Sequence, residues 1–146
     1  MKTIFSVPVT PKEYLFLQAY FECMIWADGP EGNTFGFDDL CPDFGREQTI
    51  QALNFYLENK CFLTPKTIEQ AGHDLWLTRC GHGAGFWDRG DLYVMSENGV
   101  NYADLLTERA EAYGEEYPEF IESSLIGKQT TVSYRSILLG GGKNDY

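Results

Sequence analysis

The stretch Gln70–Gly90, QAGHDLWLTRCGHGAGFWDRG, is the segment on which the expected fold of this chain depends. Within it, the side chains of Leu75–Thr78 alternate with a period of two, which is typical of a β-strand. The glycines at 81, 83 and 85 favour a tight loop, because glycine adopts positive φ without steric cost. Phe86–Trp87 would return as the second strand of a hairpin. The segment therefore predicts a change from helices to an antiparallel sheet at about Asp74.

The sequence before this segment predicts helices. Thr10, Pro11 and Glu13 form a helix start, in which threonine caps, proline suits the first helical position and glutamate completes a capping box. The helix that follows is apolar nearly all round, which indicates a central, buried helix or one with a partner. The expected helices in this half of the chain cover residues 11–27, 46–59 and 64–71.

The sequence after this segment predicts mixed elements. Asn98-Gly99 is a strong hairpin signal, so residues 92–102 are expected to form two strands and a turn. A helix is expected over 103–114, a last strand over 130–139 and a loose tail over 140–146. The result is one α+β domain over residues 1–139, with N-terminal helices followed by an antiparallel sheet that one acidic helix covers.

The composition limits the function classes. The chain has 146 residues, of which 43% are hydrophobic, enough for the core of one domain. No run approaches the roughly 18 apolar residues of a membrane helix, and no cleavage site follows Met1–Phe5, so we expect a cytoplasmic protein. The four cysteines form no C-x-x-C pair, which favours reduced thiols.

The formal net charge of −11 is the second informative property of the chain. Direct binding to nucleic-acid phosphates needs clustered lysine and arginine, so it is not expected. An acidic protein is instead attracted to basic surfaces of other proteins, including their nucleic-acid-binding clefts.

Two candidate chemistries lie within Gln70–Gly90. His73 and His82, with Cys80 between them, have the side-chain types that bind zinc, but their spacing matches no standard site. On a hairpin, His73 would also lie at the opposite end of the strand from His82. Alternatively, Cys80, His82 and Asp88 have the types of a thiol–imidazole–carboxylate catalytic group. The glycine loop matches no dinucleotide or P-loop pattern, so no cofactor is expected.

The same segment also has a purely structural interpretation. Glycines then shape the loop, aromatic side chains pack on the helices, and histidines and aspartates bond the loop backbone. Arg79 and Arg89 flank the loop and are expected to pair with Asp74, Asp88 or Asp91. This interpretation needs no active site there.

An acidic run follows, with seven carboxylates and one base between Asp104 and Glu122. The candidate partner-binding residues are Asp104, Glu108, Glu111, Glu115 and Glu119. The first four are spaced 4, 3 and 4 residues apart and would share one helix face. At about 1.5 Å of rise per residue, such a row imitates the phosphates of one DNA strand. An ordinary solvated helix face is the alternative.

Residues 71–90 resemble a segment of small uncharacterised proteins of bacteriophages and related mobile elements, which reads AGHDFWLTRNGHGAGFWDRG or similar. Leu106–Gly114 resembles a second piece of those proteins, L-T-E-A-A-x-A-Y-G. Cys80 stands where asparagine is usual, which argues against Cys80 as a nucleophile. The expected hairpin also precedes the second piece, where the resemblance implies a strand pair after it. The resemblance implies a phage-type context in a bacterial host and no established chemistry.

Three functional hypotheses follow. The first is a small acidic accessory protein that binds and inhibits a host protein with a basic surface, such as a nucleic-acid-binding defence factor of the restriction or CRISPR type. The second is a metal-dependent or Cys/His enzyme centred on residues 73–91. The third is a structural or interaction protein without a catalytic site.

Overall fold

A computed structural model describes residues 2–30, 35–93 and 96–127 of the chain. This part of the chain is dominated by helices, not by a sheet covered by a helix as expected. The five α-helices are α1 (Pro11–Asp28), α2 (Pro42–Asn59), α3 (Ile68–Arg79), α4 (Tyr102–Glu111) and α5 (Glu122–Gly127). Short 3-10 turns are η1 (Phe37–Asp39), η2 (Lys60–Phe62) and η3 (Phe86–Asp88), and one hairpin joins β1 (Lys2–Ile4) to β2 (Val7–Val9).

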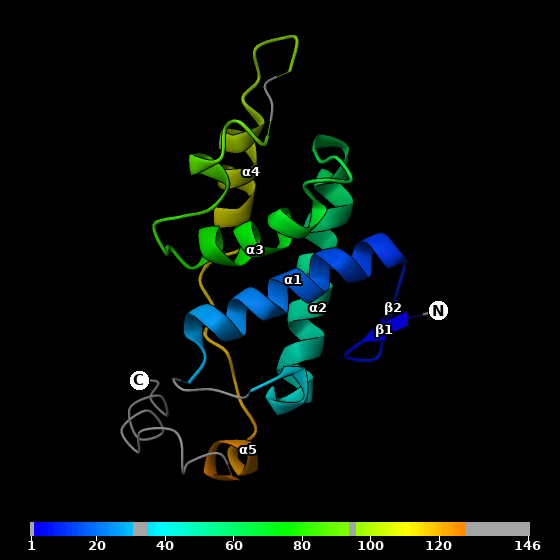
Figure 1. Cartoon of the computed structure of the whole chain (residues 1–146), viewed down its shortest axis with the longest axis vertical. Helices are drawn as coiled ribbons and strands as arrows, with labels where there is room; N and C mark the ends of the chain where they lie inside the picture. The colour runs from blue at the N-terminus through cyan, green and yellow to red at the C-terminus, as the bar shows by residue number, and fades with distance from the viewer. Residues whose placement is uncertain (1, 31–34, 94–95, 128–146) are drawn as a thin grey trace.

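The helix α1 is the centre of the fold, as its all-round apolar sequence predicts. It begins with the expected capping box, because Thr10 and Glu13 each bond the other's backbone N–H. The helix crosses α2 and lies beside α3, and α4 packs on the far side of α3 (Figure 1). The core between them contains large, fully buried side chains, among them Phe16, Tyr20, Phe21, Phe55, Trp76 and Phe86.

The prediction of a strand at Leu75–Thr78 is wrong, because these residues belong to α3. Helical spacing of three and four residues relates the buried positions Ile68, Ala71, Gly72, Leu75, Trp76 and Arg79. The short alternation was misleading because this half of α3 is buried on every side, so apolar residues occur at every phase. Gly72 lets α1 and α3 approach closely, since a Cβ there would overlap the carbonyl oxygen of Phe16.

The returning strand at Phe86–Trp87 is also wrong, since these residues form η3. The residues described between 92 and 102 form turns and the start of α4, not a strand pair. The expected strand 130–139 and tail 140–146 lie outside the described residues. In the described part of the chain, β1 and β2 form the sheet, with Lys2 opposite Val9. No α-helix in that part is both long and apolar enough to span a bilayer.

The helices expected at 46–59, 64–71 and 103–114 agree with the sequence in type and differ at their ends, whereas α5 was not expected. α2 begins at Pro42, four residues before the expected start, because proline occupies its first turn. The segment 64–67 is a turn, so the third helix begins only at Ile68. α4 buries Ala103, Leu106 and Ala110 and ends at Glu111, before a positive φ at Gly114.

The buried guanidinium of Arg79 joins four segments of the fold. Its Nη1 donates to the Tyr20 hydroxyl (3.0 Å) and to Gln48 Oε1 (3.3 Å), on α1 and α2. Its Nε and Nη2 donate to the carbonyl oxygens of Gly114 and Tyr113, just after α4. Arg79 is only 4% exposed, and every acceptor of these four hydrogen bonds is neutral. It therefore serves packing, and none of these bonds is the expected pairing with an aspartate.

Candidate functional site

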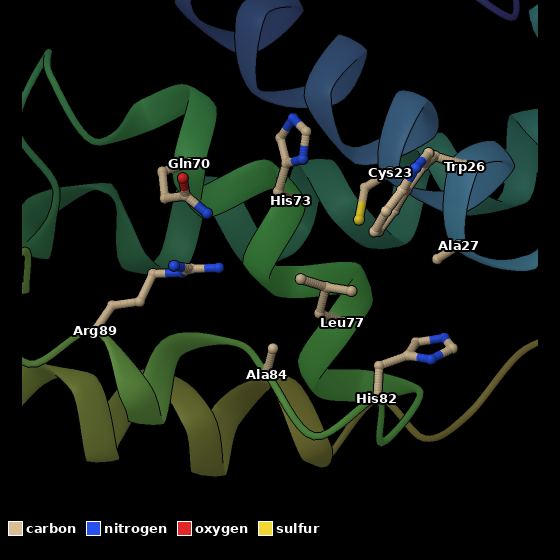
Figure 2. A pocket seen from close by; sticks show the side chains of 9 residues that line it. All are labelled: Cys23, Trp26, Ala27, Gln70, His73, Leu77, His82, Ala84 and Arg89. Carbon is tan, nitrogen blue, oxygen red and sulfur yellow. The ribbon is translucent and has the colours of Figure 1, made fainter.

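A groove of about 700 Å³ lies between α1, α3 and the loop that follows α3. Figure 2 shows the side chains that line it, from α1, from α3 and from the loop and turn after α3. They are Cys23, Trp26, Ala27, Gln70, His73, Leu77, His82, Ala84 and Arg89. This volume is within the range of sites for small organic ligands, about 300–1,000 Å³.

A carboxylate fixes the histidine at one end of the groove. His82 Nε2 lies 2.7 Å from Asp28 Oδ2, and the same oxygen accepts a 2.6 Å hydrogen bond from Trp76 Nε1. Because Asp28 ends α1 and Trp76 is buried in α3, the loop that carries His82 is tied to both helices. The Nε2 atom carries a proton toward the carboxylate, which leaves Nδ1 as the second polar atom of the ring.

A second carboxylate fixes the arginine at the other end. Arg89 Nε donates to Asp74 Oδ1 at 2.8 Å, and Asp74 is fully buried. Asp74 also accepts from the Tyr93 hydroxyl (2.7 Å) and from Gln70 Nε2 (3.0 Å). Hydrogen bonding to Asp74 raises the pKa of Arg89, and burial raises the pKa of Tyr93. Both shifts favour a charged arginine and a neutral, donating tyrosine.

Part of the groove lining is aromatic and apolar. Trp26, on α1, is 77% exposed, which is unusual for the largest apolar side chain. Figure 2 places Trp26 beside Cys23, across the groove from Leu77 and Ala84. Burial raises the pKa of the Cys23 thiol to about 12, so this sulfur stays protonated and acts as an apolar surface.

The proposed group Cys80, His82 and Asp88 does not form the contacts of a catalytic group, because each side chain has a different partner. The Cys80 thiol donates to the carbonyl oxygen of Glu116 at 3.5 Å, and burial raises its pKa to about 12. Asp88 accepts from the Gly85 N–H at 3.0 Å and caps η3. His82 pairs with Asp28 instead.

The structure brings His73 and His82 to the same groove, although a hairpin would have separated them. Both line it, His73 from α3 and His82 from the loop (Figure 2). Among residues 2–30, 35–93 and 96–127, no three His, Cys, Asp or Glu side chains are grouped closely enough to hold a metal ion.

The expected row of acids is divided in two. Asp104, Glu108 and Glu111 lie on α4, and all three are exposed. Glu115 and Glu119 are exposed too, but they follow the end of the helix. The Glu119 carbonyl accepts from the Cys41 N–H at 2.8 Å, which places Glu119 beside the start of α2. The helix-face spacing therefore holds for the first three carboxylates only.

The sequence missed part of the groove and anticipated part of it. The pair Arg89–Asp74 was among the expected pairings and is confirmed. Asp28 and Trp26 were not proposed as site residues, because Asp28 opens a turn-rich segment and Trp26 sits in a largely buried helix. An exposed tryptophan is recognised only once the helix face is known.

Comparison of the chain with protein-family models, with curated proteins and with solved structures finds no significant match.

Proposed function

We propose that this protein binds a basic surface of another protein through the α4 acidic face, defined as Asp104, Glu108 and Glu111. The observation that supports this most directly is the exposure of all three carboxylates on one rigid helix. Within the described part of the chain, the ion pairs involve Asp28 and Asp74, and none involves this face. Three uncompensated charges therefore remain available to a cationic partner.

The packing of α4 holds these charges in place. Ala103, Leu106 and Ala110 bury the opposite face, and the Asn101 side chain caps the first turn at Asp104 N. Arg109, the one base of the helix, donates to Asn59 Oδ1 at 2.7 Å and lies over the Phe62 ring. Its charge is therefore directed to α2 and η2.

The spacing of the face fits a partner that binds phosphates. Positions 104, 108 and 111 are separated by about 6 and 4.5 Å along the helix axis at 1.5 Å per residue. A groove that binds successive DNA phosphates presents cations at comparable intervals. The partner that fits is a nucleic-acid-binding protein, and the finer form of this proposal is inhibition of a bacterial host's nuclease in its cytoplasm.

The test compares two triple variants with equal charge change. Asp104→Asn/Glu108→Gln/Glu111→Gln neutralises the α4 acidic face, and Glu22→Gln/Glu47→Gln/Glu69→Gln neutralises three exposed carboxylates on other helices. Purified basic DNA nucleases are assayed for DNA cleavage with each protein at about 50 and 300 mM salt, which differ strongly in screening. We expect the wild type and the control to inhibit one such enzyme at low salt.

The face variant should need at least about tenfold more protein for the same inhibition, as loss of close charge pairs implies. Equal weakening by both triple variants would mean that net charge alone is responsible, and the α4 proposal would be wrong. The double variant Glu115→Gln/Glu119→Gln is a further arm. It should have a smaller effect, because these residues lie off the helix.

A further inference from the structure

We infer that the groove between α1 and α3 is a binding site for a small aromatic anion, a flat ring system that carries a phosphate or carboxylate. This site is distinct from the α4 acidic face and does not depend on it. The inference combines a cation at one end, a fixed imidazole at the other and an exposed indole on the same groove lining.

The arginine end is suited to an anionic group. The Nε–H of Arg89 is used in the hydrogen bond to Asp74. Within the described residues, no hydrogen bond involves Nη1 or Nη2 of Arg89. The Arg89 side chain is 30% exposed and lines the groove, whereas Asp74 is fully buried. The buried carboxylate therefore orients the guanidinium while two nitrogens stay available, and a planar fork of this kind binds phosphate and carboxylate oxygens.

The histidine end is suited to a second polar group of the same ligand. Asp28 orients the His82 ring through Nε2, and no hydrogen bond of Nδ1 occurs in the described part of the chain. His73 lines the same groove from α3, and its imidazole also has no hydrogen bond to the described residues. His82 offers one polar ring nitrogen and His73 offers two, and such polar groups fix the orientation of a ligand.

The apolar part of the groove lining is suited to a flat ring. The Trp26 indole is exposed, Cys23 lies beside it, and Leu77 adds apolar surface across the groove. Aromatic rings stack on an exposed indole with a favourable contribution beyond simple burial. Because most of the Trp26 side chain is exposed on the groove lining, an aromatic ligand is the occupant that its position favours.

The charges exclude the main alternatives. A cationic ligand would approach Arg89 unfavourably, since Asp28 and Asp74, which contact groove residues, are already engaged. A long nucleic acid would be repelled by the net charge of −11. A small anion meets less of this repulsion than a polyanion does, because it carries only one or two charges.

The test is isothermal titration calorimetry with two matched pairs of probes. Adenosine 5′-monophosphate and adenosine differ in the phosphate, and indole-3-acetate and indole differ in the carboxylate. At least one anionic probe should bind with a Kd below about 1 mM. Its neutral analogue, and inorganic phosphate or acetate alone, should bind at least about tenfold more weakly. The stronger of the two anionic probes identifies the preferred anionic group.

Two variants locate the binding. Arg89→Gln and Trp26→Ala should each weaken binding of the anionic probe at least about tenfold, from loss of a charge-assisted contact or of ring stacking. Trp87→Ala is the matched control, since Trp87 is exposed and does not line the groove, and it should change the affinity less than about twofold. If Arg89→Gln fails to fold with Asp74 unpaired, Asp74→Asn/Arg89→Gln removes both charges together.

Either of two results would overturn the proposal. The first is that neither anionic probe binds more tightly than its neutral analogue. The second is that the probe binds the Trp26→Ala and Arg89 variants as tightly as the wild type, with unchanged melting temperature. Because no step of this test involves α4, its failure leaves the proposed protein-binding function untouched.

Discussion

His82 Nε2 lies 2.7 Å from Asp28 Oδ2 although 54 residues separate them, and Trp76 Nε1 shares that oxygen. The carboxylate therefore anchors both an exposed loop and a buried indole. Asp28→Ala leaves the Trp76 N–H without its acceptor, which costs about 1–3 kcal/mol in the free energy of unfolding. His82→Gln leaves that bond intact and should cost less than about 1 kcal/mol, as for other exposed pairs. Urea denaturation measures both, and equal losses would contradict the role of Trp76.

The contact of Gly72 with α1 makes a second prediction. Gly72→Ala places a methyl group against the Phe16 carbonyl oxygen and should lower the free energy of unfolding by about 1–3 kcal/mol or more, as overpacking does. Gly90→Ala is the matched control, because a Cβ there has no neighbour within 4 Å and its φ is not positive. Chemical denaturation of both variants checks this. A Gly72 variant as stable as the control would show that α1 and α3 do not approach so closely.

The buried carboxylate of Asp74 makes a third prediction. Asp74→Ala removes the acceptor of Arg89, Tyr93 and Gln70 and should cost about 3–5 kcal/mol, as loss of one partner of a buried pair does. The loss should persist at about 1 M salt, because buried pairs are weakly screened. Arg46, on α2, is exposed with no ion pair among the described residues, so Arg46→Ala is a suitable control. A loss that disappears in salt would contradict burial of the pair.

The cysteines make a fourth prediction, on thiol reactivity. Cys61 is exposed, whereas Cys23 and Cys80 are buried and burial raises the pKa of each to about 12. A disulfide reagent at about pH 8 should therefore label Cys61 first, since the thiolate is the reactive form. Cys61→Ser should remove the fast phase and leave the slow phases. Fast labelling of Cys80 in that variant would contradict its burial.

The same two thiols, Cys23 and Cys80, predict how the stability of the protein changes at alkaline pH. The pKa of Cys23 and Cys80 is higher in the folded state than the ordinary 9.0, so folding favours their protonated form. Their contribution to stability is full below pH 9.0 and is lost as the pH rises toward 12. Denaturation midpoints measured from pH 8 upward should fall, and less steeply in Cys23→Ala. A Cys23→Ala profile parallel to that of the wild type would contradict this assignment.

Sequence signals that act within one helical turn predicted the helices in which they occur. The capping pattern Thr10-Pro11-Lys12-Glu13 gives the start of α1 because it acts within one turn. The strand prediction at Leu75–Thr78 was wrong because four residues are too few to distinguish a two-residue period from a helix that is buried on every side. Starting the window at Ile68 would have included the three- and four-residue spacing that identifies α3.

The groove could be predicted only in its residue types. Histidines, arginine and tryptophan around a glycine loop indicated a site, but the partners that orient them come from other segments. Asp28 is 54 residues from His82, and no spacing in the sequence relates the two. Asp74 and Arg89 are 15 residues apart, close enough that their pairing was among the expectations. The acidic row was predicted as far as α4 extends, and Gly114 marks where the helical spacing no longer applies.

The Arg79 hydrogen bonds also bear on how this molecule opens. If α1, α2 or the segment after α4 separated from the rest, the buried Arg79 guanidinium would lose hydrogen-bond acceptors. Each separation is therefore energetically costly. The backbone amides of these segments should therefore exchange with solvent deuterium in one cooperative event, near the global free energy of unfolding. The exposed turn at residues 96–100 lacks such a tie and should exchange through local fluctuations. One charged side chain on α3 thus joins α1, α2 and the segment after α4 into a single unfolding unit.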